Sequence, residues 1–374
     1  MLGYRRRRET RPAGAGLGRL GPAVAWALFF CLTGAILEAR TERSGDAHEL
    51  SGELAGKGWI VFAAGTPRGD LDLFRARPDG SQLKNLTDTP DLDEFGGRFS
   101  PDGQQLLWRQ TRRGQEINHD NWGAVGALVV ASSQGRDRAV LAADAELPWA
   151  SWGPGGKRIA CLYRSEGRIR MVDVKSGIQE GADLPAHGVF QQLFWSPDGR
   201  FLVGTANVAG REWNILVHDI ASGHTEIISR SLNCTPDWFP DSSACLYSHR
   251  NPNIGSDDRG QRSTAIGENP AYSWTMLMRA DREGRERNLL VAEQYRHLYF
   301  GCLSPDGKYL IYTRLETDDQ LLGPLAVVRT ADTPIIDGEW QLLARRYRNS
   351  GSGPVLRLGL PPGFEPHWTY AQLP

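Results

Sequence analysis

A five-residue turn motif recurs along this chain and constrains its fold more than any other feature. An aromatic or apolar residue is followed by Ser, Pro, Asp and Gly at residues 99–103, 195–199 and 303–307, and degenerate copies occupy residues 152–156 and 238–242. Pro presets the backbone angle of the second turn position, Asp hydrogen-bonds to the local backbone, and Gly adopts the left-handed conformation that closes a hairpin. Each copy therefore predicts a tight turn between two strands.

The segments between these turns predict further strands at regular intervals. The first strand after each turn is expected at Gln105–Trp108, Arg158–Leu162, Phe201–Gly204, Ala244–Tyr247 and Tyr309–Tyr312. A second strand follows at Ala127–Val130, Arg168–Val172, Asn214–Val217, Thr275–Met278 and Leu325–Val328, and then a second turn that contains Gly and a last strand. The repeat length of about 40–50 residues, with four strands in each unit, is typical of propeller blades.

The two ends of the chain supply one more blade. Trp59–Ala63, Leu71–Phe74 and Gln82–Leu86 resemble the second, third and fourth strands of a unit that lacks its own inner strand, and residues 365–369 resemble that missing strand. Pairing of the C-terminal strand with the first blade would leave no open sheet edge. We therefore predict an all-β fold, a six-bladed β-propeller of four-stranded antiparallel blades, with the first blade closed by the C-terminal strand.

The turn motifs also resemble those of a known family. The aromatic-Ser-Pro-Asp-Gly turns, together with Asn85-Leu86-Thr87 at the end of the first blade, resemble the TolB-like, WD-repeat-like propellers of bacterial envelopes over about residues 58–374. TolB carries a separate N-terminal domain, which the short segment 40–57 cannot supply. The resemblance therefore implies the propeller and an envelope setting, without the complete role of TolB.

The N-terminal segment predicts export. The first 19 residues hold six Arg and one Glu, a charge of +5, so the remaining chain carries −6 of the total of −1. An uncharged apolar run follows at residues 20–37, which is typical of a signal peptide or a single-pass membrane anchor, and we favour the uncleaved anchor. The predicted division is a signal or anchor at 1–39, a linker at 40–57 and the propeller at 58–374, in the periplasm or on the periplasmic side of the inner membrane.

Charge and cysteine content exclude some functions. The acidic remainder of the chain forms no basic stripe, so we expect no nucleic-acid partner. Cys161, Cys234, Cys245 and Cys302 fall within predicted strands. An exported protein could join them in any of three disulfide pairings, but we favour buried free thiols. No Cys-x-x-Cys pair is present to hold zinc in the usual way.

The long loops direct attention to one face of the predicted propeller. Residues 111–126, 248–273 and 344–364 exceed what compact blades need, and long loops are often functional or disordered. They lie on the face opposite the Pro-Asp-Gly turns, together with the connections between blades. We therefore expect a binding site on that loop-rich face.

The candidate binding residues on that face are polar or aromatic. They are Glu94, Trp122, His187, Arg296, His297 and His367. The three histidines could bind a metal ion, because neutral imidazole is a common ligand, but we favour the interpretation that they are solvated residues at the rim of the channel. We predict neither a metal nor another cofactor. The recurring Trp residues are expected to be wedged between blades.

Three functions remain open from the sequence. The first is an exported or membrane-tethered envelope protein that binds a protein, peptide or glycan, and the absence of catalytic motifs favours it. The second is a metal-dependent lyase of acidic oligosaccharides, as the resemblance to some TolB-like relatives implies, with His187, His297 and His367 as ligands and Arg296 as a substrate clamp. The third is a propeller that works with a separate peptidase, since we expect no hydrolase domain after the closing strand.

Overall fold

The structure is a computed structural model that describes most of the chain after residue 46. The described residues are 47–115, 125–146, 149–208, 210–230, 232–250, 275–293, 296–317, 320–332 and 355–373. The predicted signal or anchor at residues 20–37 lies outside these ranges, as do Trp122 and most of the three long loops. Within the described ranges, no helix is both long enough and apolar enough to span a membrane.

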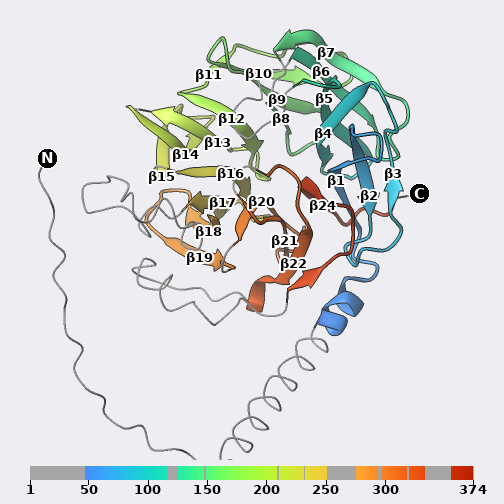
Figure 1. Cartoon of the computed structure of the whole chain (residues 1–374). Coiled ribbons are helices and arrows are strands. Elements are labelled where there is room, and N and C mark those ends of the chain that lie inside the picture. Colours follow the sequence, from blue (N-terminus) through green and yellow to red (C-terminus); the bar gives the residue numbers. More distant parts are fainter. Residues whose placement is uncertain are drawn as a thin grey trace, which may run out of the picture. The chain divides into compact units, whose positions relative to one another are not determined.

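The described chain forms sheets of mostly antiparallel strands, arranged in a ring (Figure 1). The first sheet has the order β24-β1-β2-β3, formed by Gly363–Thr369, Trp59–Gly65, Leu71–Ala76 and Lys84–Asn85. The second is β4-β5-β6-β7, formed by Leu92–Phe99, Gln105–Arg112, Val125–Ser132 and Ala139–Glu146. The third is β8-β9-β10-β11, formed by Trp149–Trp152, Arg158–Tyr163, Arg168–Asp173 and Leu184–Pro185.

Two further sheets complete the ring. The fourth is β12-β13-β14-β15, formed by Val189–Trp195, Phe201–Val208, Arg211–Asp219 and Thr225–Ser229. The fifth has eight strands. It contains β16 (Asn233–Trp238), β17 (Ala244–Arg250), β18 (Thr275–Asp281), β19 (Arg287–Val291), β20 (His297–Leu303), β21 (Tyr309–Leu315), β22 (Leu325–Arg329) and β23 (Leu356–Arg357), and the 3₁₀ helix η2 (Thr330–Asp332) follows β22.

The all-β propeller is confirmed, but the expected six separate four-stranded blades are wrong. Only four sheets are separate four-stranded blades, because strands β16 to β23 form a single sheet. Within it, β18 and β20 pair in parallel at Thr275 and His297, whose Oγ1 and Nδ1 atoms are 3.1 Å apart. The N-terminal signal or anchor helix included in the expected fold has no support either, since residues 1–46 lie outside the described ranges.

The predicted turn chemistry is confirmed at each full motif. In the first copy, the Ser100 hydroxyl donates to Asp102 Oδ1 at 2.6 Å, and the same carboxylate accepts from the Gln104 N–H at 3.0 Å. The Gly103 N–H donates to the Ser100 carbonyl at 2.7 Å, and Gly103 has a φ of 71°. The left-handed glycine thus closes the hairpin as the sequence predicted.

Closure of the ring by the C-terminal strand is also confirmed. β24 pairs antiparallel with β1, from Trp59 opposite Thr369 to Ala64 opposite Gly363. β1 therefore has a hydrogen-bonded neighbour on both sides, which removes the exposed edge that an open sheet would have.

Residues 47–54, within the segment we expected to be a linker, form a helix that packs against the sheets. Leu50 and Leu54 are fully buried in an apolar cluster with residues of β1, β21 and β22. Glu53 accepts hydrogen bonds from Arg329 at 2.8 and 3.0 Å and from the Tyr309 hydroxyl at 3.1 Å. The compact unit accordingly begins at Ala47.

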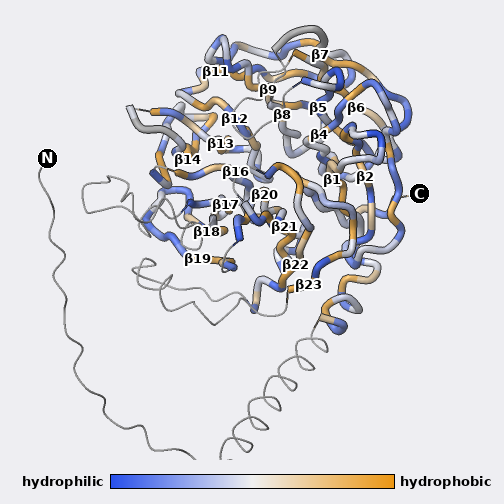
Figure 2. Tube along the Cα trace, in the orientation of Figure 1, coloured by the Kyte–Doolittle hydropathy of each residue, from blue (hydrophilic) through white to orange (hydrophobic). Residues whose placement is uncertain are grey.

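The core consists of apolar layers between neighbouring sheets. Figure 2 shows hydrophobic stretches in the strands and hydrophilic stretches in many connecting turns. Trp152 and Trp238 show how the layers are fixed, because their indole N–H groups donate at 3.0 Å to the carbonyls of Arg98 and Phe194 in the preceding inner strands. The expectation that Trp residues are wedged between blades is confirmed for these two residues.

Candidate functional site

A cavity of about 330 Å³ lies where the inner strands end at the Pro-Asp-Gly turns. We call this side of the ring the turn face and the opposite side the loop face. The prolines of successive turns form part of the cavity wall: Pro101, Pro154, Pro197, Pro240 and Pro305. The size falls in the range of small ligand sites, about 300–1,000 Å³.

The cavity wall also follows a rule that can be read in the sequence. The residue immediately before the first position of each of the five turn motifs lines the cavity, and so does the residue before Trp368 in β24. These residues, which we call the pre-aromatic ring, are Arg98, Ser151, Phe194, Asp237, Cys302 and His367. Each comes from a different inner strand, so the ring fold brings together positions that are far apart in the sequence.

An ion pair crosses the cavity wall. Arg98 Nη1 donates to Asp237 Oδ2 at 2.9 Å, which joins β4 to β16 across 139 residues of sequence. The two side chains are only 12% and 17% exposed, and Arg98 also lies 4.4 Å from the ring centre of Phe194. Burial lowers the pKa of Arg98, but Asp237, Cys302 and Glu365 together outweigh it and the net shift is upward. The Arg98 guanidinium is therefore charged, and the Asp237 side chain beside it is its partner in the cavity wall.

His367 adds a neutral polar group to the same wall. Its Nδ1 accepts from the Phe99 backbone N–H at 3.1 Å, which leaves the ring proton on Nε2. Burial, and then the charge of Arg98, holds the pKa of His367 well below its usual value. The cavity therefore contains an uncharged imidazole that can donate one hydrogen bond.

The hydroxyl groups of the turns already form hydrogen bonds within the turns. The Ser196 and Ser304 hydroxyls donate to Asp198 and Asp306 in their own turns at 2.6 and 2.7 Å. The Trp residues in the wall are 3–8% exposed, so they present little of their ring faces to a ligand. The groups left to contact a ligand are the ion pair, His367 and apolar surface.

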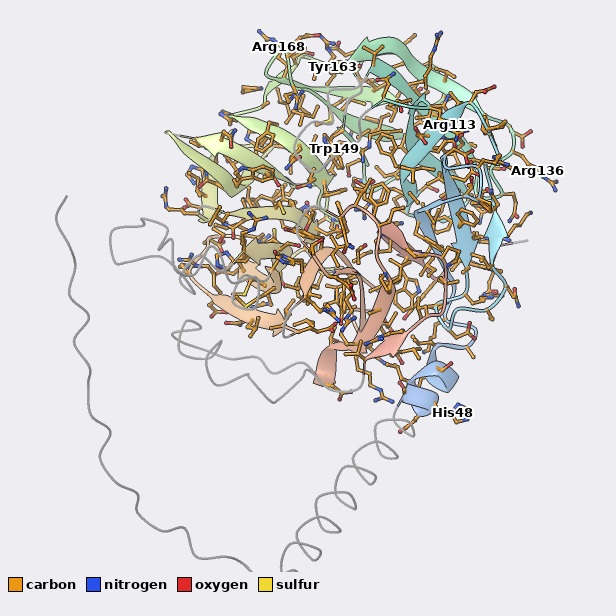
Figure 3. The ribbon with its side chains drawn as sticks, in the orientation of Figure 1. His48, Arg113, Arg136, Trp149, Tyr163 and Arg168 are labelled. Atoms are coloured by element: carbon orange, nitrogen blue, oxygen red, sulfur yellow. The ribbon has the colours of Figure 1, made fainter. Side chains whose placement is uncertain are left out.

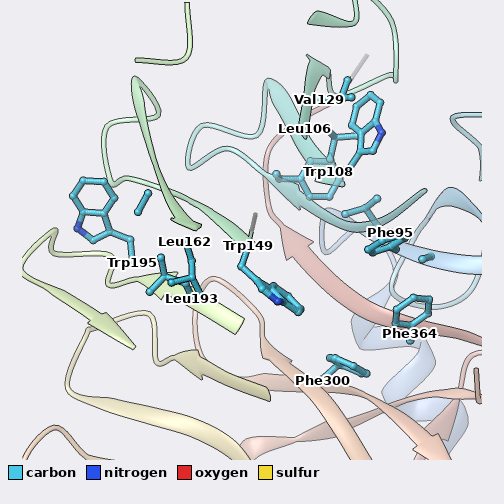
Figure 4. Packing of buried hydrophobic residues seen from close by; sticks show 14 of the residues in the cluster. Phe95, Leu106, Trp108, Val129, Trp149, Leu162, Leu193, Trp195, Phe300 and Phe364 are labelled. Atoms are coloured by element: carbon cyan, nitrogen blue, oxygen red, sulfur yellow. The ribbon is translucent and has the colours of Figure 1, made fainter. Parts of the chain in front are cut away.

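A second ion pair lies deeper in the ring. Arg109 Nη2 donates to both carboxylate oxygens of Glu365 at 2.8 and 2.9 Å, and both residues are almost fully buried. The guanidinium lies 3.5 Å from the centre of the Trp149 ring. Figure 3 shows Trp149 in the middle of the ring of sheets, and Figure 4 shows it near Phe300 and Phe364. These groups fill the centre beneath the cavity.

Hydrogen bonds between neighbouring inner strands hold the cavity wall in place. Most inner strands contain a bulge with one left-handed residue, such as Gln192, Thr235 and Phe300 with φ of 55°, 48° and 52°. Gln192 Oε1 accepts from the Thr235 N–H at 2.6 Å, and Thr235 Oγ1 accepts from the Phe300 N–H at 3.3 Å. Left-handed backbone in residues other than Gly is strained and persists where the surroundings fix it.

The structure does not bring the predicted site residues together. Only His367 lines the turn-face cavity. His297 is buried beside Thr275, Arg296 lies 3.5 Å from Glu316, and His187 is exposed on the connection between β11 and β12. Trp122 lies outside the described residues. Across the described ranges, no group of three or more His, Cys, Asp and Glu residues is placed to hold a metal ion.

Glu94 is buried on the side of β4 that faces β2. Both of its carboxylate oxygens are enclosed without a hydrogen-bond partner. Burial raises the pKa of Glu94 to about 8, and the nearby Asp72 carboxylate acts in the same direction. Asp72 itself accepts from Asn85 Nδ2 at 2.6 Å and from Arg68 Nη2 at 3.0 Å. Glu94 is therefore a neutral carboxyl inside the fold, with no exposed surface for a ligand.

The expected free thiols are confirmed. Cys161, Cys234, Cys245 and Cys302 form no disulfide, and all but the half-buried Cys234 are fully buried. Burial raises the pKa of Cys302, which borders the cavity, to about 12. The thiol is therefore protonated near neutral pH and is a poor nucleophile.

Comparisons with known proteins agree on the architecture. No protein-family model and no curated protein matches the chain. Among solved structures, TolB from Acinetobacter baumannii superposes with a TM-score of 0.55 at 16% identity, over 83% of this chain and 66% of that one. This chain has a TolB-like propeller fold.

Two further structures extend this likeness. A protein of Agrobacterium tumefaciens assigned as TolB gives a TM-score of 0.53 at 15% identity, over 84% of this chain and 94% of that one. Nidogen in its complex with laminin gives 0.50 at 14% identity, over 75% of this chain and 92% of that one. At these identities the likeness establishes the TolB-like fold and leaves the ligand to be argued from the site.

Proposed function

We propose that this chain is an exported cell-envelope protein that binds an extended polypeptide segment of a partner in the turn-face cavity. The basic and apolar N-terminal sequence supports export, and the TolB-like fold supports an envelope binding role. The observation that carries the site is the pre-aromatic ring, which gathers Arg98, Asp237 and His367 from three separate strands around one cavity.

The composition of the wall favours a polypeptide over a glycan. A sugar ring usually stacks on an open aromatic face, whereas the Trp residues here are almost fully buried between sheets. The rigid proline turns and Phe194 offer apolar contacts to side chains. His367 Nε2–H can donate to a backbone carbonyl of the bound segment.

The Arg98–Asp237 ion pair favours a partner segment that carries a charged group at its tip. Arg98 and Asp237 are fixed by each other and by the surrounding strands, so they are oriented before a ligand arrives. A carboxylate of the partner would gain a hydrogen bond from Arg98, and an ammonium would gain one from Asp237. Charge-assisted bonds of this kind are stronger than neutral ones.

Affinity capture with variants of the full chain tests the proposal. The chain would be immobilised, incubated with envelope extract from its own host, and the bound protein identified and its affinity measured by titration. Asp237→Asn and His367→Asn should each weaken binding by about 10-fold or more. Asp237→Asn loses a hydrogen bond at a charged group, worth about 1.5–3 kcal/mol, and His367→Asn loses one at a neutral group, which is worth somewhat less. Arg296→Gln, on the loop face, is the matched control and should bind as the unmodified chain does.

The opposite pattern would overturn the proposal. Loss of capture with Arg296→Gln, together with full capture by Asp237→Asn and His367→Asn, would move the site to the loop face. Turnover of an acidic oligosaccharide that depends on an added divalent metal would instead support the lyase hypothesis.

A further inference from the structure

A cluster of hydrogen-bond donors without acceptors lies away from the turn-face cavity, on the first sheet. Arg75 Cζ lies 4.1 Å and Arg77 Cζ 3.7 Å from the ring centre of Trp59. The strand register explains the arrangement. Val61 pairs with Arg75 and Ile60 with Ala76, so Trp59 lies directly across from Arg77 and diagonally from Arg75.

Arg75 is buried over the Trp59 ring without a carboxylate or a hydrogen-bond acceptor. It is only 6% exposed, and its Nε and Nη1 atoms are enclosed with no hydrogen-bond acceptor. The indole Nε1 of Trp59 is likewise buried without an acceptor. A buried donor that lacks an acceptor costs about 1–3 kcal/mol, and more when it is charged. Three unpaired N–H donors in one cluster therefore indicate that an acceptor is missing.

The neighbouring side chains add positive charge and supply no acceptor. Among the described residues, no carboxylate forms an ion pair within 4.0 Å with Arg75 or Arg77. Arg77 Nη1 donates a hydrogen bond to the Gly58 carbonyl at 3.0 Å. Lys84 pairs with Arg75 across β2 and β3. Asp79, in the adjacent turn, already accepts from the Ser81 N–H at 2.9 Å.

Burial and like charge both act on Arg75. It lowers the pKa of Arg75, and the positive charge of Arg77 lowers it further. Bringing a negative charge to the cluster would reverse both effects, since it would compensate two like charges in a poorly solvated position.

We propose that Trp59, Arg75 and Arg77 form a binding site for an oxyanion, either a carboxylate or a phosphate. Guanidinium groups present N–H donors in a planar fork that matches two oxygens of such a group. Arg77 is half-buried, whereas Arg75 and the indole N–H are buried. This site is independent of the turn-face cavity and of the function proposed for it.

Two sources could provide the oxygen acceptor. One is a soluble or partner-borne group that binds from the side of the half-exposed Arg77. The other is an oxygen acceptor from the chain's own C-terminal residues up to Leu373, because Leu373 packs against an apolar cluster that includes Trp59. The chemistry of recognition is the same in both cases, and the test below separates them.

Thermal unfolding of the full chain with inorganic phosphate is the direct test. Phosphate should raise Tm in a saturable manner, relative to chloride at the same ionic strength, and Arg75→Met should abolish this rise. Because Arg75→Met removes an unpaired buried charge, its Tm in chloride should equal or exceed that of the unmodified chain. Arg136→Met replaces an exposed arginine at the periphery (Figure 3) and should keep the full response to phosphate.

A second form of the chain distinguishes the two sources. If phosphate has no effect on the complete chain but raises Tm after removal of residues 372–374, and Arg75→Met again abolishes the rise, the chain's own segment fills the site. If phosphate affects neither form, or if the Arg75→Met response equals that of the unmodified chain, the proposal is wrong. Arg77→Gln, which changes the half-buried member of the cluster, provides the same readout should Arg75→Met fail to fold.

Discussion

Charged side chains inside this protein are accommodated in three different ways. Arg109 and Glu365 compensate each other in a buried ion pair, Glu94 is held as a neutral carboxyl, and Arg75 has no ion-pair partner. The three cases have different energetic consequences. Breaking a buried pair leaves an isolated charge, whereas replacing a neutral carboxyl or an unpaired cation removes an existing cost.

Glu94→Gln should make the stability of the protein less sensitive to pH. The folded state raises the pKa of Glu94 from 4.5 to about 8, so between these values the folded form holds a proton that the unfolded form has lost. The free energy of unfolding should therefore fall as pH rises through this window, by up to about 1.4 kcal/mol per pH unit. In urea unfolding at several pH values, the free energy of unfolding of Glu94→Gln should increase relative to that of the unmodified chain as pH rises. The exposed Glu286→Gln is the control, and parallel curves for all three proteins would contradict the prediction.

The Arg109–Glu365 pair should give strongly non-additive effects. Arg109→Met alone leaves the Glu365 carboxylate buried and unpaired, and we expect a loss of about 3–5 kcal/mol in the free energy of unfolding. Arg109→Met combined with Glu365→Gln should lose much less than the sum of the two single changes. Chemical denaturation of the three variants measures this coupling, and additive losses would show that the pair does not act as a unit.

At the scale of elements, the turns were predictable and the bulges were not. Pro, Asp and Gly act through their own backbone preferences, so the sequence of the Ser100 turn was sufficient to predict the bond from Asp102 to the backbone and the left-handed Gly103. Gln192, Thr235 and Phe300 have no preference for left-handed backbone. Contacts between neighbouring inner strands impose that conformation, and a single strand sequence does not contain them.

The helix at residues 47–54 and the turn-face cavity were missed for different reasons. Leu50 and Leu54 had the spacing of one helical face, but the polar, Gly-containing segment around them favoured a linker. The cavity was missed because loop length directed the prediction to the opposite face. The charged residues placed directly before Phe99 and Trp238, Arg98 and Asp237, were the available signal. His367 was the one predicted residue that the fold brought to that wall.

Gly103→Ala should be more destabilising than a matched change in an open turn. Both Gly103 and Gly177 have positive φ, 71° and 69°, which costs an L-residue about 1–2 kcal/mol. A Cβ on Gly103 would also lie 2.1 Å from the Ala371 Cβ, whereas one on Gly177 would meet nothing within 4 Å. Comparing the Tm of Gly103→Ala with that of Gly177→Ala separates the effect of the Ala371 contact from the effect of positive φ. Equal decreases in Tm would show that the segment after β24 moves aside at no cost.

For the whole molecule, the sequence was sufficient to predict ring closure but not the grouping of strands into sheets. The likeness of residues 365–369 to the inner strands predicted the β24–β1 pairing. The eight-stranded sheet depends on a single parallel pair at Thr275 and His297. Such a contact depends on how two neighbouring hairpins pack against each other. The repeat pattern of the sequence is the same with or without this contact, so it does not predict it.

Deletion of β24 should prevent stable folding of the ring. Removal of residues 363–374 would expose one edge of β1. It would also uncover Phe62 and the residues that pack against Phe364 in the apolar clusters. We expect loss of the cooperative thermal transition, because the strand closes the first sheet and supplies Glu365 to Arg109. Removal of residues 372–374 alone is the control and should retain the transition. A cooperative transition in the larger deletion would show that the ring is stable when open.

The antiparallel β1–β24 ladder also determines how the ring would respond to mechanical force. Trp59 pairs with Thr369, so the chain enters β1 and leaves β24 at the same end of the ladder. Ladder hydrogen bonds run perpendicular to the strands. Tension between residue 58 and residue 370 would therefore load these bonds one after another, like a zipper, and not all at once in shear. The seam of the ring is thus its weakest point under load, and it would open before the other sheets were disturbed.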